Sequence, residues 1–260
     1  MPSPPPRHLR TEEEHQTLPA HLREHRTDLT VVPVSLPPSP HPAKYAPGLA
    51  TALIRYAGTE DVGDPMAGTG RLAEETRLPL ALNEISPRWK PNLQHLRDTL
   101  DCTVSFENAQ DGVPWERETL IFSPPYYPKA DRCRPAGHND EKRGAVVGFR
   151  DSYGDGHLPG FIGDPAGKNA ILLYRNAMRK IFFSLGRGRT RRMLLVTKNW
   201  TRLGTEMRLD LDLFLTAQEA GWRPEARTGW VPPASLWARY NERRGGMITV
   251  EDVLVLTRNP

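Results

Sequence analysis

The stretch LIFSPPYYP, residues 120–128, combines several groups that could hold a polar ligand. It presents the hydroxyl of Ser123, two prolines at Pro124 and Pro125, and an aromatic pair that begins with Tyr126. Proline lacks an N–H and restricts the residue before it to extended geometry, so the chain leaves the predicted strand stiffly. The segment therefore offers fixed hydrogen-bond acceptors beside an aromatic face. The alternative interpretation is a proline-rich strand exit with surface aromatics.

A second candidate segment, DPMAGTG at residues 64–70, follows a predicted strand and opens a predicted helix. Gly68 and Gly70 let the backbone approach a ligand closely, and open α/β sheets bind ligands at such turns. The segment lacks the third glycine of G-x-G-x-x-G and the lysine of a P-loop, which argues against a phosphate-cradling loop. Ordinary strand–helix turns also use glycine, so this turn alone does not indicate a function.

Two further polar residues end the next two predicted strands. Glu84, in LPLALNEIS, could accept both hydroxyls of a ribose, and Asn108, in SFENAQD, could pair with an adenine edge. Taken singly, each has a simpler interpretation, as a solvated acid and as a turn asparagine. Together with residues 64–70 and 123–126 they form an ordered series, which predicts a single ligand site along one sheet edge.

The elements that must position these residues alternate between strand and helix patterns. We expect strands within residues 60–65, 78–85, 102–109, 119–125 and 191–200, and helices within 49–58, 70–76, 87–100, 169–186 and 211–222. Such alternation predicts a parallel, doubly wound α/β sheet. The segments 225–233 and 250–259 are expected as two antiparallel strands, which gives about seven strands in all.

The composition is that of one substantial α/β domain of 260 residues. The two cysteines, Cys102 and Cys133, form no CxxC, so we expect no disulfide framework, no metal site and a reducing cytoplasm. No apolar run approaches a membrane span, and the first residues lack the apolar core of a signal peptide. A net charge of +4 permits a polyanionic partner without requiring one.

The ordered motifs DPMAGTG, NE, ENA and SPPY resemble those of class I S-adenosylmethionine-dependent amino methyltransferases. They are most similar to the DNA enzymes that methylate exocyclic amines of cytosine or adenine. The resemblance covers roughly residues 40–260 and implies a Rossmann-like class I fold with S-adenosyl-L-methionine as cofactor. HPAKYAPG resembles the family segment that closes over the methionine end of the cofactor. The cofactor-binding residues implied are His41, Pro42, Lys44, Tyr45, Asp64, Pro65, Met66, Ala67, Gly68, Gly70, Glu84, Asn108 and Ser123.

The resemblance gives the SPPY segment a catalytic role, carried by Ser123, Pro124, Pro125 and Tyr126. An exocyclic amine is a poor nucleophile because its lone pair is delocalised into the ring. If Ser123 Oγ and the Pro124 carbonyl each accept one N–H, the nitrogen moves towards tetrahedral geometry and its lone pair becomes available. Tyr126 provides a face on which an extruded base can stack. Methylation of a ring carbon needs a cysteine nucleophile, usually beside a proline, and neither cysteine has such a neighbour.

Serine at the first position of this motif is commonest in the N4-cytosine enzymes, which favours double-stranded DNA as the partner and cytosine N4 as the target. Adenine N6 is the next alternative, followed by an amine of RNA or protein. Outside enzymes, the rival is a non-catalytic nucleic-acid-binding subunit that kept the fold. Retention of the acidic, glycine and SPPY residues together argues against that rival.

The expected domain organisation is a disordered or loosely ordered tail at residues 1–30 and a catalytic domain at 31–260. An insertion at about residues 129–168 is rich in glycine and charged residues and lacks a sustained period. Because it directly follows SPPY, it is the candidate substrate-recognition loop. The candidate nucleic-acid-binding residues within it are Arg132, Arg134, Lys142, Arg143 and Arg150.

Overall fold

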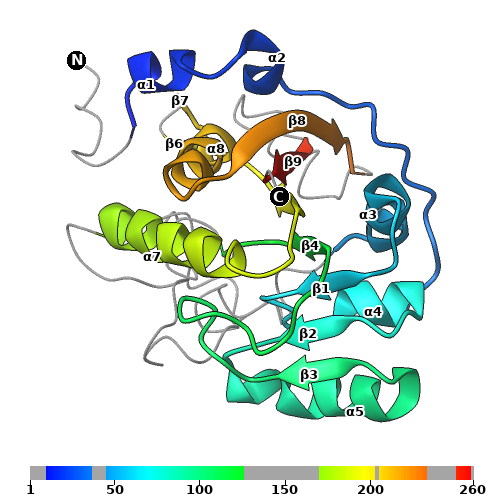
Figure 1. Ribbon diagram of the computed structural model, residues 1–260. Helices are drawn as coiled ribbons and strands as arrows, with labels where there is room; N and C mark the ends of the chain where they lie inside the picture. The colour runs from blue at the N-terminus through cyan, green and yellow to red at the C-terminus, as the bar shows by residue number, and fades with distance from the viewer. Residues whose placement is uncertain (1–9, 37–44, 126–169, 203–204, 233–249, 259–260) are drawn as a thin grey trace, which may run out of the picture.

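The computed structural model describes residues 10–36, 45–125, 170–202, 205–232 and 250–258 (Figure 1). The helices are α1 (Glu12–Gln16), α2 (Ala20–Arg23), α3 (Leu49–Ala57), α4 (Arg71–Thr76), the 3-10 turn η1 (Pro87–Trp89), α5 (Lys90–Leu100), α7 (Ala170–Leu185) and α8 (Leu209–Glu219). The strands are β1 (Val62–Asp64), β2 (Ala81–Asn83), β3 (Thr103–Ser105), β4 (Thr119–Phe122), β5 (Arg192–Thr197), β6 (Trp200–Arg202), β7 (Thr205–Met207), β8 (Arg223–Trp230) and β9 (Glu251–Thr257).

Seven of these strands form one sheet in the order β3-β2-β1-β4-β5-β9-β8. Strands β1 to β5 pair in parallel, whereas β9 pairs antiparallel with both β5 and β8. The chain first builds outward from β1 to β3 and then returns to place β4 on the other side of β1. The predicted seven-stranded, mostly parallel sheet is confirmed. In open α/β sheets, ligands bind at such a switch point, outside the carboxyl ends of the strands.

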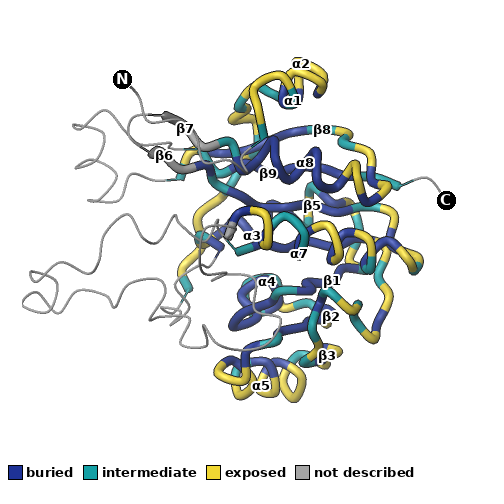
Figure 2. Tube along the Cα trace, turned by 90° about the vertical axis from the view of Figure 1, so that its left-hand side faces the viewer, coloured by how far each residue is buried: buried dark blue, intermediate teal, exposed yellow. Residues whose placement is uncertain are grey.

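The core lies on both faces of this sheet, because neighbouring strand residues point to opposite sides. In β4, Leu120 and Phe122 belong to the cluster beneath α7 and α8, while Ile121 belongs to the cluster beneath α3, α4 and α5. Figure 2 shows the central strands β1, β4, β5 and β9 buried along most of their length and the outer turns of α5 exposed. The sheet edge is therefore carried by a rigid layer, as a precise binding site requires.

Local signals in the sequence place several helix ends. Gly58 ends α3 in the left-handed conformation with φ 72°, as expected of a glycine after a helix. Pro87 begins η1, which runs directly into α5. The short hairpin of β6 and β7 follows β5 and was not predicted, since its two strands have only three residues each.

The expectation of a loosely ordered N-terminal tail is wrong for residues 10–30. Thr11 and Glu14 form a reciprocal capping box at the start of α1. Leu18 and Leu22 are buried in the same cluster as α7 and α8. His15 Nε2 lies 2.7 Å from an oxygen of Asp212 on α8. The apolar content of this segment is low, but Leu18, Leu22 and His15 contact the body of the protein, and α1 and α2 lie beside α8 and β8 (Figure 1).

No helix in the described part of the chain is both long and apolar enough to span a bilayer.

Candidate active site

The predicted site segments meet at the carboxyl edge of the sheet, around the switch point between β1 and β4. Strand β1 ends at Asp64 and lies between β2 and β4. Glu84 directly follows β2, and Ser123 directly follows β4. Because these three strands are parallel, the three side chains leave the sheet at one edge, as the motif order predicted.

The glycine turn after β1 has a backbone that only glycine accommodates readily. Gly68 and Gly70 have φ of 54° and 79°, in the left-handed region. A Cβ at Gly70 would also lie 2.3 Å from Cδ1 of Leu96 and 2.9 Å from Cδ2 of Leu93 on α5. The turn is thus fixed by its own conformation and by close packing on α5.

Glu84 holds this turn against the end of β2. Its Oε2 accepts the N–H of Gly68 at 2.8 Å, and its Oε1 accepts the N–H of Ser86 at 2.8 Å. The carboxylate is buried. Glu84, which the sequence analysis predicted to bind a ribose, therefore also joins the loops that contain Gly68 and Ser86. A carboxylate oxygen has more than one acceptor site, so the two roles are compatible.

Asn83, the residue before Glu84, makes a second set of hydrogen bonds between strand ends. All the hydrogen-bonding capacity of its side-chain amide is in use. Its Nδ2 donates to the carbonyls of Pro65 at 3.1 Å and Glu107 at 2.9 Å. Its Oδ1 accepts the Ser105 hydroxyl at 2.8 Å and the Glu107 N–H at 2.9 Å. One buried side chain thereby joins the ends of β1, β2 and β3. The motif NE contained this residue, but only its glutamate was interpreted from the sequence.

Asp64 is a buried carboxyl group at the centre of the site. Burial and the nearby Glu84 raise its pKa to about 8, although the Met66 N–H, 2.9 Å from Oδ1, and Tyr45 act in the opposite direction. Tyr45 is itself buried, and its hydroxyl interacts with the carboxyl group of Asp64. Burial and Asp64 raise the pKa of Tyr45 well above its usual value.

These groups define which ligands the turn can accept. Two buried carboxyl groups, Asp64 and Glu84, face each other without a cationic partner for Asp64 in the described part of the chain. The N–H of Gly68 is already bound to a carboxylate, so it is not available to cradle a phosphate. A positively charged ligand would favour the ionised form of Asp64, which burial and the neighbouring Glu84 otherwise disfavour. The carboxyl groups of Asp64 and Glu84 therefore fit a positively charged ligand, such as the ammonium and sulfonium of S-adenosylmethionine. They do not fit the negatively charged pyrophosphate of a dinucleotide.

The proline segment after β4 is anchored from a helix that follows it by almost fifty residues. Ser123 is half-buried and Pro124 is buried. The hydroxyl of Tyr174, on α7, donates to the carbonyl of Pro125 at 2.6 Å. Tyr174 lies in the core and is almost fully buried. The sequence analysis did not identify this tyrosine, because nothing in its local pattern separates it from an ordinary core residue of an amphipathic helix.

Several predicted residues have a different or an untested place. Asn108 forms a turn in which its Oδ1 accepts the Gln110 N–H at 3.1 Å, which matches the simpler interpretation of a turn asparagine. Met66 is partly buried and packs against the core cluster of α7 and α8. The predicted residues outside the described ranges are His41, Pro42, Lys44, Tyr126, Arg132, Arg134, Lys142, Arg143 and Arg150.

Two arginines that follow α7, Arg189 and Arg192, lie at the edge of the sheet opposite the site. Arg192 begins β5, whose carboxyl end lies beside the site, and its Nη1 donates to the Ala57 carbonyl at 3.1 Å. Arg189 pairs with Asp61 just before β1, at 2.7 Å. These arginines bind the protein's own helix end and carboxylate, so they are not suited to contact a substrate held at Ser123.

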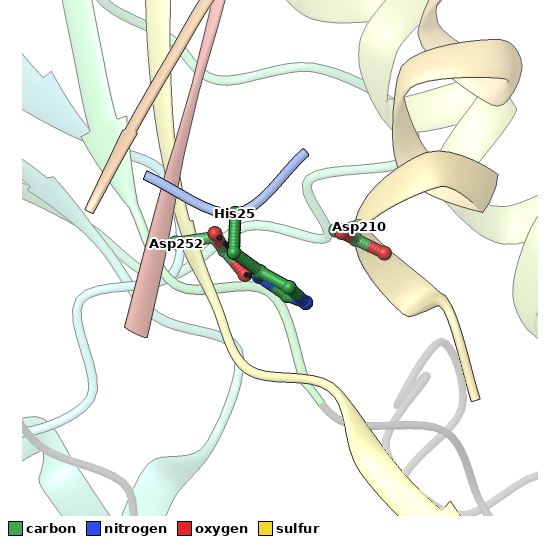
Figure 3. Close-up of side chains that lie close together, drawn as sticks. All are labelled: His25, Asp210 and Asp252. Carbon is green, nitrogen blue, oxygen red and sulfur yellow. Dashed lines mark hydrogen bonds and ion pairs between the residues drawn. The ribbon is translucent and has the colours of Figure 1, made fainter. Parts of the chain in front are cut away.

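A group of three potential metal ligands comprises the partly buried His25 and the buried Asp210 and Asp252 (Figure 3). His25 Nδ1 lies 3.0 Å from an oxygen of Asp252. The buried guanidinium of Arg227 donates to Asp252 at 2.9 Å and also pairs with Asp210. Burial alone would raise the pKa of Asp210, but Arg227 and Arg208 outweigh it and hold that pKa below its usual value. Arg227 thus supplies the positive charge, and the cluster is an ionic lock between the N-terminal segment and the sheet.

No protein-family model matches this chain, and no curated protein matches it significantly. Solved structures with a similar arrangement include TrmN from Thermus thermophilus, at 15% identity and a TM-score of 0.43 over 81% of this chain and 48% of that one. They also include the glycopeptide N-methyltransferase MtfA complexed with S-adenosyl-L-homocysteine, at 13% identity and a TM-score of 0.47, over 84% and 92% of the two chains. Magnesium protoporphyrin IX methyltransferase from Synechocystis, with bound SAH, has 12% identity and a TM-score of 0.43, over 81% of each chain.

These likenesses concern the fold, and the chain spans about half the length of TrmN. The strand order and pairing of the chain itself define a Rossmann-like α/β fold, a seven-stranded sheet in which β9 alone runs antiparallel to its neighbours.

Proposed function

We propose that this protein is an S-adenosylmethionine-dependent methyltransferase that acts on an exocyclic amine of a DNA base, with N4 of cytosine as the favoured target. The observation that carries the proposal is the position of the Ser123–Pro125 segment. It leaves β4 directly beside β1, whose end holds the acidic glycine turn. A group bound at Ser123 would therefore be a neighbour of a ligand bound at Asp64.

The cofactor would be held by Asp64, Glu84 and the glycine turn, with Tyr45 closing one side. S-adenosylmethionine supplies a methyl group that its sulfonium already activates. Glu84 would accept a ribose hydroxyl while it keeps the Gly68 and Ser86 loops in place. Asp64 would stabilise the positive charge of the methionine portion.

The amine would be held by acceptors on the β4 segment. Ser123 Oγ and the Pro124 carbonyl each accept one N–H, so the nitrogen lone pair turns away from them and towards the methyl donor. Pro125 has no N–H, so it does not compete for these acceptors. Because positioning carries most of such a reaction, a stiff segment on a buried strand suits the task. Tyr126 is proposed to stack on the extruded base.

The direct test is incubation with S-adenosylmethionine labelled on its methyl group and with duplex DNA, followed by digestion to nucleosides and mass analysis. We expect N4-methylcytosine. N6-methyladenine would change the base but keep the chemistry, and label found only in RNA or protein would change the substrate class. A 5-methylcytosine product would contradict the mechanism, because a ring-carbon product needs a nucleophile that the Ser123 segment lacks.

A matched control separates the cofactor site from the substrate site. Asp64→Ala should abolish cofactor binding, whereas Ser123→Ala should bind the cofactor normally and lose transfer. If no labelled product forms with any nucleic acid or protein extract while the wild-type protein binds S-adenosylmethionine, the cofactor assignment survives and the base-amine assignment fails.

A further inference from the structure

The hydrogen bond from the Tyr174 hydroxyl to the Pro125 carbonyl joins two residues that are 49 positions apart. Its length of 2.6 Å is short for an O–H···O bond, and one partner is almost fully buried. Tyr174 is a core residue of the sixteen-residue helix α7, which packs on α8. The Pro125 carbonyl is therefore tied to a part of the protein that moves little.

This bond holds a segment that has few other means of support. The ladder between β4 and β5 ends at Phe122. Pro124 and Pro125 have no N–H, so the backbone at these two residues cannot donate the hydrogen bonds that would continue a sheet or a turn. Its carbonyls are the remaining backbone groups through which it can be fixed. The Tyr174 hydroxyl donates to the Pro125 carbonyl and not to the neighbouring Pro124 carbonyl.

We infer that Tyr174 is a positioning residue for the substrate-binding segment. By holding the Pro125 carbonyl, it fixes the orientation of two hydrogen-bond acceptors, Ser123 Oγ and the Pro124 carbonyl. This inference rests on the proposed function for its effect on turnover. Because the proline ring fixes the φ of Pro125, a displacement of the Pro125 carbonyl is passed to the preceding peptide group and moves the Pro124 carbonyl with it. Misplacement of reacting groups by about 1 Å can cost as much as 100-fold in rate. Loss of the Tyr174 hydroxyl is therefore expected to have a large effect on the rate of methyl transfer.

A purely structural role for Tyr174 makes a different prediction. In that case the hydroxyl satisfies a buried carbonyl, and its loss lowers the stability of the fold without a specific effect on transfer. Ser184 offers a control on the same helix, because its hydroxyl lies 2.9 Å from a distant carbonyl, that of Ala109, and 2.9 Å from the Ile181 carbonyl of its own helix. Ser184 lies near the end of α7, away from Pro125.

The experiment compares Tyr174→Phe and Ser184→Ala with the wild-type protein. Tyr174→Phe keeps the buried ring and removes only the hydroxyl. In single-turnover methyl transfer we expect Tyr174→Phe to lower the rate constant roughly 10- to 100-fold. Cofactor affinity should stay within about twofold of wild type, because the Tyr174 hydroxyl donates to the Pro125 carbonyl and not to Asp64 or Glu84. Ser184→Ala should transfer at the wild-type rate while losing a similar amount of thermal stability.

A second readout does not depend on any activity. With carbon-13 at the proline carbonyls and the Pro125 signal assigned from Pro125→Ala, the Pro125 resonance should shift in Tyr174→Phe and stay in place in Ser184→Ala. An unmoved resonance, or equal transfer rates in Tyr174→Phe and wild type, would overturn the positioning role. If the wild-type protein methylates no amine, the proposed function fails, and the carbonyl resonance alone decides whether Tyr174 fixes this segment.

Discussion

The backbone N–H of Gly68 donates to Glu84 Oε2 at 2.8 Å, so the glycine turn after β1 and the acid after β2 form one unit. Replacement of Glu84 therefore has two effects that must be separated. Glu84→Gln keeps an oxygen acceptor for one of the two loop N–H groups but loses the charge. Glu84→Ala leaves the N–H groups of Gly68 and Ser86 unpaired.

We expect Glu84→Gln to weaken S-adenosylmethionine binding by about 1.5–3 kcal/mol, the range for hydrogen bonds to a charged group. Glu84→Ala should weaken binding at least as much and also cost about 1–3 kcal/mol of unfolding free energy for each buried N–H left unpaired. Titration calorimetry and urea unfolding measure the two quantities on the same samples. Wild-type affinity in a folded Glu84→Gln protein would remove the ribose role from this residue.

The raised pKa of Asp64 predicts that cofactor binding releases a proton. With a pKa of about 8, Asp64 is mostly protonated at pH 7, and a positively charged ligand favours its ionised form. The pKa therefore falls on binding, and affinity should rise about tenfold per pH unit between pH 6 and 7.5 as one proton is released. Above this window the amino group of the cofactor begins to lose its own proton, which opposes the trend.

Calorimetry in buffers of different ionisation enthalpy measures this proton directly. Asp64→Asn should bind more weakly and release no proton. Without ligand, wild type loses stability as the pH rises from the unfolded pKa of 3.8 to the folded pKa of about 8, so Asp64→Asn should gain on wild type over this range and keep the gain above it. Proton release that persists in Asp64→Asn would assign the linkage to another group.

The parallel sheet and the order of the motifs could be predicted because their signals are local. Each strand is a short apolar run, and glycine or proline marks the adjoining helix ends, as at Gly58 and Pro87. The polar residue after each strand then follows from its place in the sequence, since parallel strands end at one edge. Glu84 and Ser123 were selected as candidates in this way, and the structure places both directly after their strands.

The remaining features depend on contacts between distant parts of the chain, which local pattern does not specify. Tyr174 meets Pro125 across 49 positions, and His25 meets Asp252 across 227. In the sequence, Tyr174 has the spacing of any core residue, and His25 lies in a polar segment that resembles a tail. The order of residues 10–30 arises from a few buried groups that find partners on α8 and β8, so low apolar content was a misleading signal.

The Asn83 amide predicts a stability effect that is separate from catalysis. Asn83→Ala removes a buried side chain that makes four hydrogen bonds to the ends of β1 and β3. We expect a loss of about 2–4 kcal/mol in unfolding free energy, because several buried groups lose their partners at once. Asn83→Asp should also be destabilising, since it replaces two donors by acceptors that face carbonyls. Urea unfolding measures both, and a wild-type midpoint in either variant would contradict the role of Asn83 in joining the strand ends.

The ionic lock around Arg227 predicts that the N-terminal segment and the fold lose stability together. Arg227→Met leaves Asp210 and Asp252 buried without their main cationic partner, a change that typically costs about 3–5 kcal/mol. We also expect faster proteolytic cleavage within residues 10–30. Arg97→Met is the matched control, because Arg97 pairs with Asp98 at the exposed surface and should cost less than about 1 kcal/mol. Equal stability of the two variants would contradict the lock.

Ser123 is expected to contribute to the transfer step more than to binding. Its hydroxyl accepts an amine N–H whose hydrogen bond strengthens as the nitrogen loses planarity, so its contribution grows towards the transition state. Ser123→Ala should therefore lower the single-turnover rate constant roughly tenfold, equivalent to about 1.4 kcal/mol, and leave DNA and cofactor affinities nearly unchanged. Tyr126→Ala should weaken capture of the base as well, since stacking is worth roughly 1–3 kcal/mol, whereas Tyr126→Phe should keep most activity. Full transfer by Ser123→Ala would remove the serine from the mechanism and leave the Pro124 carbonyl as the main acceptor of the amine.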